Sequence, residues 1–349
     1  VQRELELRNF VPKPYWEIEG DFSQYKGTYF DHNNENETKF FSKEKAEALM
    51  KQFGTHGTVV QVSKKKETKY APALHSLQEL SNEANRTYGY TMAETLKIAQ
   101  SLYEKKILSY PRTDSQYITS AIAKEFGTYL KSVACIPELK NRANQVMNNP
   151  TLMNEVAKNK KYVDDKKVSD HYAIIPTGVT VDVSNLSEKE RNIFTLVCKR
   201  FLAIFMPPMI TNKTNIVTES NGHLFHTNGS VLIDLGYMSL YNYKANNTVV
   251  PDLKKGDVFE LQTVNLVEKK TTPPARYTDE TLGKVMENVG RLVEDEELSN
   301  VLKEANGLGT PATRGAIVEK LVDLKMIERK RKSFYATDFG ISIIQSLEG

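Results

Sequence analysis

The apolar residues of this 349-residue chain change their spacing three times. They alternate as in β-strands along residues 14–40 and 58–62, and they recur with helical spacing from about residue 75. Residues 209–266 alternate again, and helical spacing returns after Pro273-Pro274. This order predicts an α+β fold in which the two strand segments join into one domain and the helical segment is inserted between them.

We therefore predict a multidomain chain whose domains are discontinuous. The predicted domains are a strand-rich one (20–74 and 206–270), an inserted helical one (75–205) and a second helical one (1–19 and 271–349). The last is predicted to close with a hairpin, Met326 to Thr337, that carries Arg329-Lys-Arg-Lys332 near its tip. A helix followed by a basic hairpin is typical of a winged helix.

Three amphipathic helices are predicted inside residues 75–205. One starts with the capping-box spacing Thr91 to Glu94 and presents Leu96, Ala99, Leu102 and Tyr103 on one face. Another runs from Ile122 to Val133, and a third is opened by Ser187 with Glu190 three residues on. Their apolar faces describe a core and carry no chemistry.

Composition excludes several classes of protein. With 40% hydrophobic and 26% charged residues, the chain is neither disordered nor fibrous. Two cysteines, Cys135 and Cys198, are too few for a disulfide framework or a Cys₄ zinc site, so we expect reduced, buried thiols in a cytosolic protein. No apolar run reaches about 18 residues, which excludes a membrane-spanning helix. A net charge of +3 means that any basic surface must come from local clustering.

The most informative stretch is Leu-Ser-Tyr-Pro-Arg-Thr-Asp-Ser at residues 108–115, in the connection between two predicted helices. Pro111 holds Tyr110 extended. A phenol is a poor nucleophile unless its phenolate is stabilised, and Arg112 is close enough to do so or to grip a phosphate. Most of the 17 tyrosines pack in cores, and that reading stays open for Tyr110.

Two further segments carry polar groups in suggestive places. His171, in Asp-His-Tyr-Ala-Ile-Ile-Pro-Thr at residues 170–177, could hydrogen-bond a phosphate oxygen or relay a proton, or simply mark a strand entry. Gly-Leu-Gly-Thr-Pro-Ala-Thr-Arg at residues 307–314 places Pro311 at the first position of a helix capped by Thr310. Such a start is a phosphate site, to which Thr313 and Arg314 add a hydroxyl and a charge, but it needs no ligand.

Further basic residues lie elsewhere. Lys64, Lys65 and Lys66 form a run that we place in a connection, where a solvated loop explains it as well as DNA binding does. Arg276 follows Pro273-Pro274.

The three motifs, in this order, resemble those of type IA DNA topoisomerases, and the bacterial topoisomerase III branch resembles the chain more closely. Residues 3–16, 81–86 and 274–278 fit as well, so the resemblance covers essentially the whole chain. It implies a strand-rich arch domain and an inserted helical, winged-helix-like domain bearing the catalytic tyrosine. It also implies a second helical domain that binds DNA, adjoins the gate and carries the basic hairpin. It also implies an ATP-independent isomerase that cleaves one DNA strand, passes another segment through and reseals the break.

Roles follow from the resemblance position by position. Tyr110 matches the tyrosine that becomes a 5′-phosphotyrosine, Arg112 the arginine on the scissile phosphate, and His171 a phosphate-contacting histidine. Asp114 stands where the family has an orienting carboxylate, and Thr313 at a hydroxyl position near the active site. Where other branches carry Arg-Pro-Ser-Thr, this chain has Thr310-Pro-Ala-Thr313. The expected DNA contacts are Thr310, Thr313, Arg314, Arg276, Lys64, Lys65 and Lys66.

The family's Mg²⁺ ligands are a Glu and an Asp-x-Asp-x-Glu cluster in an N-terminal Toprim domain. No Asp-x-Asp-x-Glu occurs here, and the acidic run at residues 294–297 has the wrong spacing. We therefore expect a topoisomerase body cut from a larger protein, inactive alone, with Mg²⁺ bound only in the complete enzyme and no metal ligands of its own. The expected partner is single-stranded DNA in supercoiled or catenated molecules, with no membrane, and the expected form is a monomer in the bacterial cytoplasm, at the nucleoid.

The sequence is also compatible with two rival functions. A noncatalytic single-stranded-DNA-binding module would explain the same basic and aromatic residues, with Tyr110 merely packing. A tyrosine recombinase fits less well, because its nucleophile lies near the C-terminus after an Arg and a His-x-x-Arg set, whereas Tyr110 precedes His171 here.

Overall fold

The computed structural model describes residues 1–32, 37–293, 295–305 and 307–348 of a chain that divides into two compact units. The helical unit comprises Val1–Leu5, Ala71–Pro207 and Ala275–Gly349. The sheet unit comprises Glu6–Tyr70 and Pro208–Pro274. The sheet unit thus contains most of the two segments predicted as strand-rich, and the helical unit contains residues 75–205 and 275–349. Residues 6–19, predicted to belong to the second helical domain, lie in the sheet unit.

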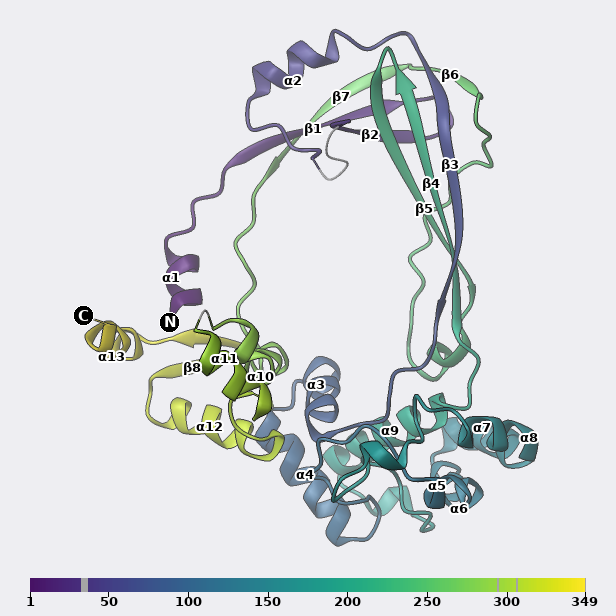
Figure 1. Cartoon of the computed structure of the whole chain (residues 1–349), viewed down its shortest axis with the longest axis vertical. Helices are drawn as coiled ribbons and strands as arrows, with labels where there is room; N and C mark the ends of the chain where they lie inside the picture. The colour runs from purple at the N-terminus through teal and green to yellow at the C-terminus, as the bar shows by residue number, and fades with distance from the viewer. Residues whose placement is uncertain (33–36, 294, 306, 349) are drawn as a thin grey trace. The chain divides into compact units, whose positions relative to one another are not determined.

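The described part of the sheet unit forms one antiparallel seven-stranded sheet of order β6-β3-β4-β5-β2-β1-β7. Its strands are β1 (Pro14–Asp21), β2 (Lys26–Phe30), β3 (His56–Lys69), β4 (Met209–Ser220), β5 (His223–Asp234), β6 (Val258–Glu260) and β7 (Thr263–Lys270). Strands β3, β4 and β5 run side by side as a long ribbon (Figure 1). Residues at least 140 positions apart, such as Lys69 and Met209, therefore pair between the two chain segments of this sheet, as their common alternation predicts.

Local sequence explains how this sheet turns and packs. Asn221 and Gly222 join β4 to β5 with φ values of 51° and 82°, the left-handed geometry that a two-residue hairpin turn requires. Helix α2 (Lys43–Met50) starts at Ser42, whose hydroxyl accepts from the N–H of Lys45. The core of the sheet unit is apolar and largely aromatic. Its fully buried members include Ile18, Phe22, Val59, Ile216 and Phe225.

The lysine run does not lie in a connection, so that prediction is wrong. Strand β3 continues to Lys69, and Lys64, Lys65 and Lys66 pair with Thr214, Lys213 and Asn212 of β4. The far half of β3 is exposed on both faces and so lacks the alternation that identifies a half-buried strand. The pairing with β4, which the sequence of β3 alone does not reveal, keeps this half extended.

The helical unit is built from helices and one hairpin. The helices are α1 (Gln2–Arg8, which continues into the sheet unit), α3 (Leu77–Tyr88), α4 (Met92–Glu104), α5 (Ser120–Ala123), α6 (Phe126–Val133), α7 (Pro137–Met147), α8 (Pro150–Ala157), α9 (Glu188–Ala203), α10 (Asp279–Glu287), α11 (Glu296–Glu304), α12 (Pro311–Asp323) and α13 (Asp338–Glu348). Strands β8 (Ile327–Lys330) and β9 (Ser333–Ala336) form the predicted closing hairpin directly after α12.

Helix α9 matches its prediction and two other helices do not. Ser187 and Glu190 form the reciprocal capping box of α9, and Ile193, Phe194 and Phe201 are fully buried. The helix predicted from Ile122 to Val133 is broken into α5 and α6. Thr91 caps α4, but the carboxylate of Glu94 bonds the ammonium of Lys189 instead of completing the box.

Three smaller predictions, on Tyr103, the cysteines and membrane helices, have mixed outcomes. Tyr103, assigned to the core face of α4, is 39% exposed. Cys198 is buried as predicted, whereas Cys135 is only half-buried. Among the described residues, no helix combines the length and the apolar character needed to cross a membrane.

Candidate active site

Tyr110 lies in the connection between α4 and α5, in a stretch whose side chains alternate between two environments. Pro111, Thr113 and Ser115 are buried, whereas Arg112 and Asp114 are exposed and Tyr110 is half-buried. Because side chains of an extended chain alternate in direction, this pattern puts the three chemically interesting groups on the open side. The intervening Pro, Thr and Ser anchor the stretch from behind.

Hydroxyl groups join this stretch to the segment that carries His171. The Ser109 hydroxyl donates to the carbonyl of Ala173 (3.0 Å) and accepts from the N–H of Ile175 (2.9 Å). The Thr113 hydroxyl donates to the carbonyl of His171 itself (3.2 Å). Two motifs that are about 60 residues apart in the sequence are thereby held in register.

Residues 75–77 lie between the two segments and bind both. The N–H of Ile174 donates to the carbonyl of His75 (2.8 Å), and the N–H of Leu77 donates to the carbonyl of Thr113 (2.9 Å). This short segment is the common support of the site.

A buried ionic cluster fixes that support. The imidazole of His75 is 2.7 Å from a carboxylate oxygen of Glu83, which also accepts from the guanidinium of Arg200. Arg200 donates in addition to the carbonyl of Ala73 (2.9 Å). Burial opposes the charge of Glu83, but His75 and Arg200 hold its pKa at about 2. Burial, followed by the nearby Arg200 charge, lowers the pKa of His75.

The rings of Tyr110 and His171 pack against each other with centroids 4.2 Å apart and planes tilted by 40°. Tyr103 meets Tyr110 edge to face at 5.3 Å. These three rings, with Tyr172, line a cavity of about 520 Å³. The first and second motifs therefore supply one site, with the phenol and the imidazole side by side.

Arg112 and Asp114 remain available for a ligand. In the described parts of the chain, no hydrogen bond or ion pair engages either side chain, and both are exposed. Asp114 lines a second cavity, of about 530 Å³, together with Pro311 and Arg314 of the third motif. The tyrosine motif thus borders both cavities, one through Tyr110 and the other through Asp114.

The third motif starts α12 as predicted, with its hydroxyls turned to capping. The N–H of Thr310 donates to the hydroxyl of Thr313 (2.8 Å), and the two hydroxyl oxygens are 3.0 Å apart. Arg314 is 1% exposed and donates to Gln78 (3.0 Å) and to the carbonyl of Leu308 (3.3 Å). Burial lowers its pKa, with Glu287 opposing. Its guanidinium points into the protein, where it joins α12 to α3, and does not extend from the surface as a DNA contact requires.

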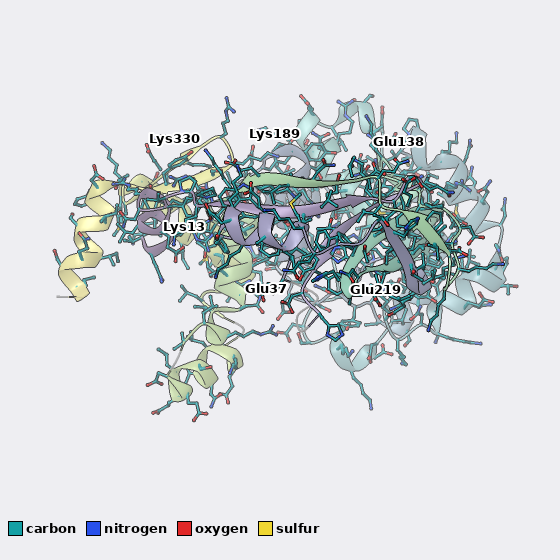
Figure 2. All side chains as sticks on the ribbon, turned by 90° about the horizontal axis from the view of Figure 1, so that it is seen from above. Lys13, Glu37, Glu138, Lys189, Glu219 and Lys330 are labelled. Atoms are coloured by element: carbon teal, nitrogen blue, oxygen red, sulfur yellow. The ribbon has the colours of Figure 1, made fainter. Side chains whose placement is uncertain are left out.

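The other predicted DNA contacts are distributed over both units. Arg276 is held by two bonds to the carboxylate of Glu4 and lies 3.8 Å over the ring of Tyr335. In the sheet unit, Lys64 pairs with Asp252. Among the described residues no carboxylate pairs with Lys65 or Lys66. In the hairpin, Arg329 bonds Asp279 and Glu319, and Lys330, labelled in Figure 2, pairs with Glu328 while 59% of its side chain stays exposed.

No group of three or more His, Cys, Asp or Glu side chains suited to a metal ion occurs within the described residues. Of the acidic run, Glu294 lies outside those residues, and Asp295 caps α11 by accepting from the N–H of Leu298. The described residues therefore offer no set of ligands that fits Mg²⁺.

Several residues of this site have no sequence pattern around them that predicts their place in it. Ser109 and the cluster of His75, Glu83 and Arg200 carry no local signal, because their partners come from distant segments. Lys106 stands out only in the structure, where its backbone has a φ of 60° directly after α4. The helical spacing around Tyr103 predicts a core position instead.

Comparison with known proteins decides the family. The DNA topoisomerase family profile matches residues 1–349. The chain belongs to the type IA DNA topoisomerase family. The DNA topoisomerase 3 of Bacillus thuringiensis (strain Al Hakam) is 35% identical over 358 residues, which cover 99% of this chain and 48% of that protein. The DNA topoisomerase 3 of Bacillus subtilis (strain 168) is 33% identical over 357 residues, with the same coverage.

The fold of this topoisomerase chain also has a solved counterpart. The full-length topoisomerase I of Thermotoga maritima matches with a TM-score of 0.69 and 23% identity, over 99% of this chain and 53% of that one. This likeness establishes the α+β fold of the family. The topoisomerase chain spans about half the length of the curated relatives that it matches.

Proposed function

We propose that this chain is the strand-cleaving body of a bacterial type IA DNA topoisomerase. One observation carries the proposal: Tyr110 and His171 come from separate motifs and share one cavity, while Arg112, two residues after Tyr110 in the same connection, is exposed and unengaged within the described residues. A nucleophile and a hydrogen-bonding imidazole at one cavity, with an unused guanidinium two residues along the chain, suit attack on a phosphodiester.

In the proposed reaction the Tyr110 oxygen forms a bond to phosphorus as the bond from phosphorus to the 3′ oxygen breaks. The phenol loses its proton and the departing 3′ oxygen gains one. Arg112 contacts the scissile phosphate, and His171 contacts one oxygen of that phosphate. Asp114 is the carboxylate that orients neighbouring groups of the active site. Religation reverses these changes, and no ATP is consumed because one phosphodiester replaces another. Catalysis then depends on position and on charge stabilisation.

We further propose that the substrate is single-stranded DNA within supercoiled or catenated molecules, bound by a monomer in the bacterial cytoplasm. Thr310, Thr313, Lys65 and Lys66 are proposed contacts. Lys64, Arg276 and Arg314 would instead support the contact surfaces, since Asp252, Glu4 and Gln78 already engage their charged groups. Mg²⁺ is proposed to act in the complete enzyme through ligands of a Toprim domain, and the 349-residue polypeptide alone is proposed to be inactive.

The alternative is a noncatalytic single-stranded-DNA-binding module. The two functions differ in whether a covalent intermediate forms.

Covalent capture tests the proposal. The chain is fused to the Toprim domain of a Bacillus DNA topoisomerase 3, incubated with Mg²⁺ and a 3′-labelled oligonucleotide, and denatured rapidly. We expect a labelled adduct with the parent protein and with Tyr117→Phe, a matched control from the same connection. Tyr110→Phe should give no adduct while it binds the oligonucleotide within a few-fold of the parent. Adducts from Tyr110→Phe, or no adducts from the parent, would refute the assignment.

A further inference from the structure

The cavity beside Tyr110 contains more than strand cleavage requires. Its volume of about 520 Å³ falls in the range of small-molecule sites, and its walls are rich in aromatic rings. Tyr110 and His171 already have roles in the proposed reaction. Tyr103, Tyr172 and Lys106 also line the cavity and do not.

The tyrosine rings offer stacking surface. Tyr103 is 39% exposed, and it meets Tyr110 only by an edge-to-face contact. Within the described residues, no hydrogen bond engages the hydroxyl of Tyr103 or of Tyr172. An aromatic ring that borders a cavity in this way is suited to stack on a nucleobase, whose two faces are apolar.

Lys106 adds a cation at an unusual backbone position. It follows α4 with a φ of 60°, its N–H donates to the carbonyl of Tyr103, and the N–H of Ile107 donates to the carbonyl of Leu102. This is the helix ending in which glycine is the favoured residue, as the same chain has at Gly89 after α3. A lysine there costs backbone energy that glycine would not.

The side chain of Lys106 has no competing partner in the described residues. It is exposed, lines the cavity, and forms no ion pair with any of them. Its neighbours differ, since Lys105 pairs with Glu190 and Glu104 accepts from Gln100. A strained residue with an unused charge at the rim of a cavity points to a ligand of opposite charge.

We propose that this cavity is a nucleotide subsite. It holds the base of the nucleotide whose 5′ phosphate is joined to Tyr110, stacked on Tyr103, while Lys106 binds the next phosphate of that strand. The register rests on the proposed function, because the nucleotide tethered to Tyr110 is the one that must lie beside its ring. The other end of the cleaved strand has no such tether.

The base contact is tested with the 349-residue chain and a short 5′-phosphorylated oligothymidine, which represents the strand retained after cleavage. Fluorescence anisotropy compares this strand with one whose first nucleotide lacks its base. Loss of the base should weaken binding about tenfold in the parent chain. Tyr103→Leu should abolish that difference and Tyr103→Phe should retain it, because only the second variant keeps a ring. A parent chain that ignores the missing base overturns the proposal.

Lys106→Gly separates the ligand role from the backbone role. Lys325, which follows α12 with a φ of 57° and the same pair of backbone hydrogen bonds, supplies the matched control Lys325→Gly. Both variants should unfold at higher temperature, since glycine suits this geometry. Only Lys106→Gly should weaken oligonucleotide binding, with a salt slope smaller by about 0.7. If Lys106→Gly is stabilised and binds as the parent does, Lys106 merely ends a helix.

The outcome can be told apart from that of the proposed function. Adducts without discrimination of the first base would overturn the subsite and leave strand cleavage by Tyr110 standing. Discrimination of the base without adducts would overturn strand cleavage and leave a noncovalent nucleotide site.

Discussion

The Ser109 hydroxyl lies between the carbonyl of Ala173 and the N–H of Ile175, at 3.0 Å and 2.9 Å. One small side chain, next to Tyr110 in the sequence, therefore satisfies two backbone groups of the segment that carries His171. Because all three residues are buried, water cannot replace these bonds. The proximity of phenol and imidazole depends on this contact.

Ser109→Ala should lower the free energy of unfolding by about 1–3 kcal/mol, because it leaves a buried carbonyl and a buried N–H without a partner. Urea denaturation measures this cost. Ser342→Ala is the control, since its hydroxyl makes a single exposed bond within α13. Equal costs for the two variants would show that the hydroxyl of Ser109 does not secure the His171 segment.

The sequence predicts that the two strand segments join, because alternation of apolar and polar residues indicates a half-buried strand wherever it occurs. Ile18 and Phe225, for example, lie on alternating stretches and are both fully buried in the shared core. The exposed end of β3 could not be found in this way. Its lysines face solvent on both sides, and only the pairing with β4 keeps them in a strand.

The residues of the candidate site likewise differ in whether the sequence reveals them. The motifs around Tyr110, His171 and Thr310 are visible because each is a compact string of residues. The buried cluster of Glu83 and Arg200 is invisible, because the two residues are 117 positions apart and neither neighbourhood requires the other. Arg314 shows the opposite error, since an arginine at a helix start is expected to reach solvent and this one is 1% exposed.

The hairpin arginines should separate stability from DNA binding. Arg329 bonds Asp279, whose pKa burial raises even though Arg329 opposes the shift, and also Glu319. Arg329→Ala should cost about 3 kcal/mol, because it leaves a buried carboxylate unpaired.

Arg331 lies at the hairpin turn with a φ of 56°, a geometry that asparagine tolerates. Arg331→Asn should change the free energy of unfolding by less than about 0.5 kcal/mol. Its affinity for single-stranded DNA should fall, with a salt slope smaller by about 0.7. Urea denaturation and salt titration of both variants test whether Arg329 serves stability and Arg331 serves DNA binding. A large loss of unfolding free energy in Arg331→Asn would contradict this division.

Glu190 should make the stability of the helical unit depend on acid pH. Burial opposes its charge, but bonds from Lys105, Ser101 and Ser187 lower its pKa to about 2. A carboxyl whose pKa is lower in the folded state stabilises the fold at neutral pH, and this contribution is lost as the pH falls from about 4.5 towards 2.

Glu190→Gln should therefore cost about 1.5–3 kcal/mol at pH 7, the worth of hydrogen bonds to a charged group. The variant should also lose less stability than the parent between pH 5 and pH 2. Glu188→Gln, at the exposed first residue of α9, should follow the parent curve. Urea midpoints across this pH range decide the matter, and parallel curves for parent and Glu190→Gln would contradict it.

The lysines of β3 should not contribute equally to DNA binding. Lys65 lies directly opposite Lys213 of β4, a like-charged pair that destabilises a sheet, although Glu67 lies 3.7 Å from Lys213. Lys65→Gln should therefore raise stability at low salt by about 0.2–1 kcal/mol. It should also weaken single-stranded DNA binding and reduce the salt slope by about 0.7, one phosphate contact.

Lys64→Gln is the control, because Asp252 already neutralises that ammonium, and its slope should stay near that of the parent. Two variants with the same slope as the parent would show that DNA does not follow this ribbon.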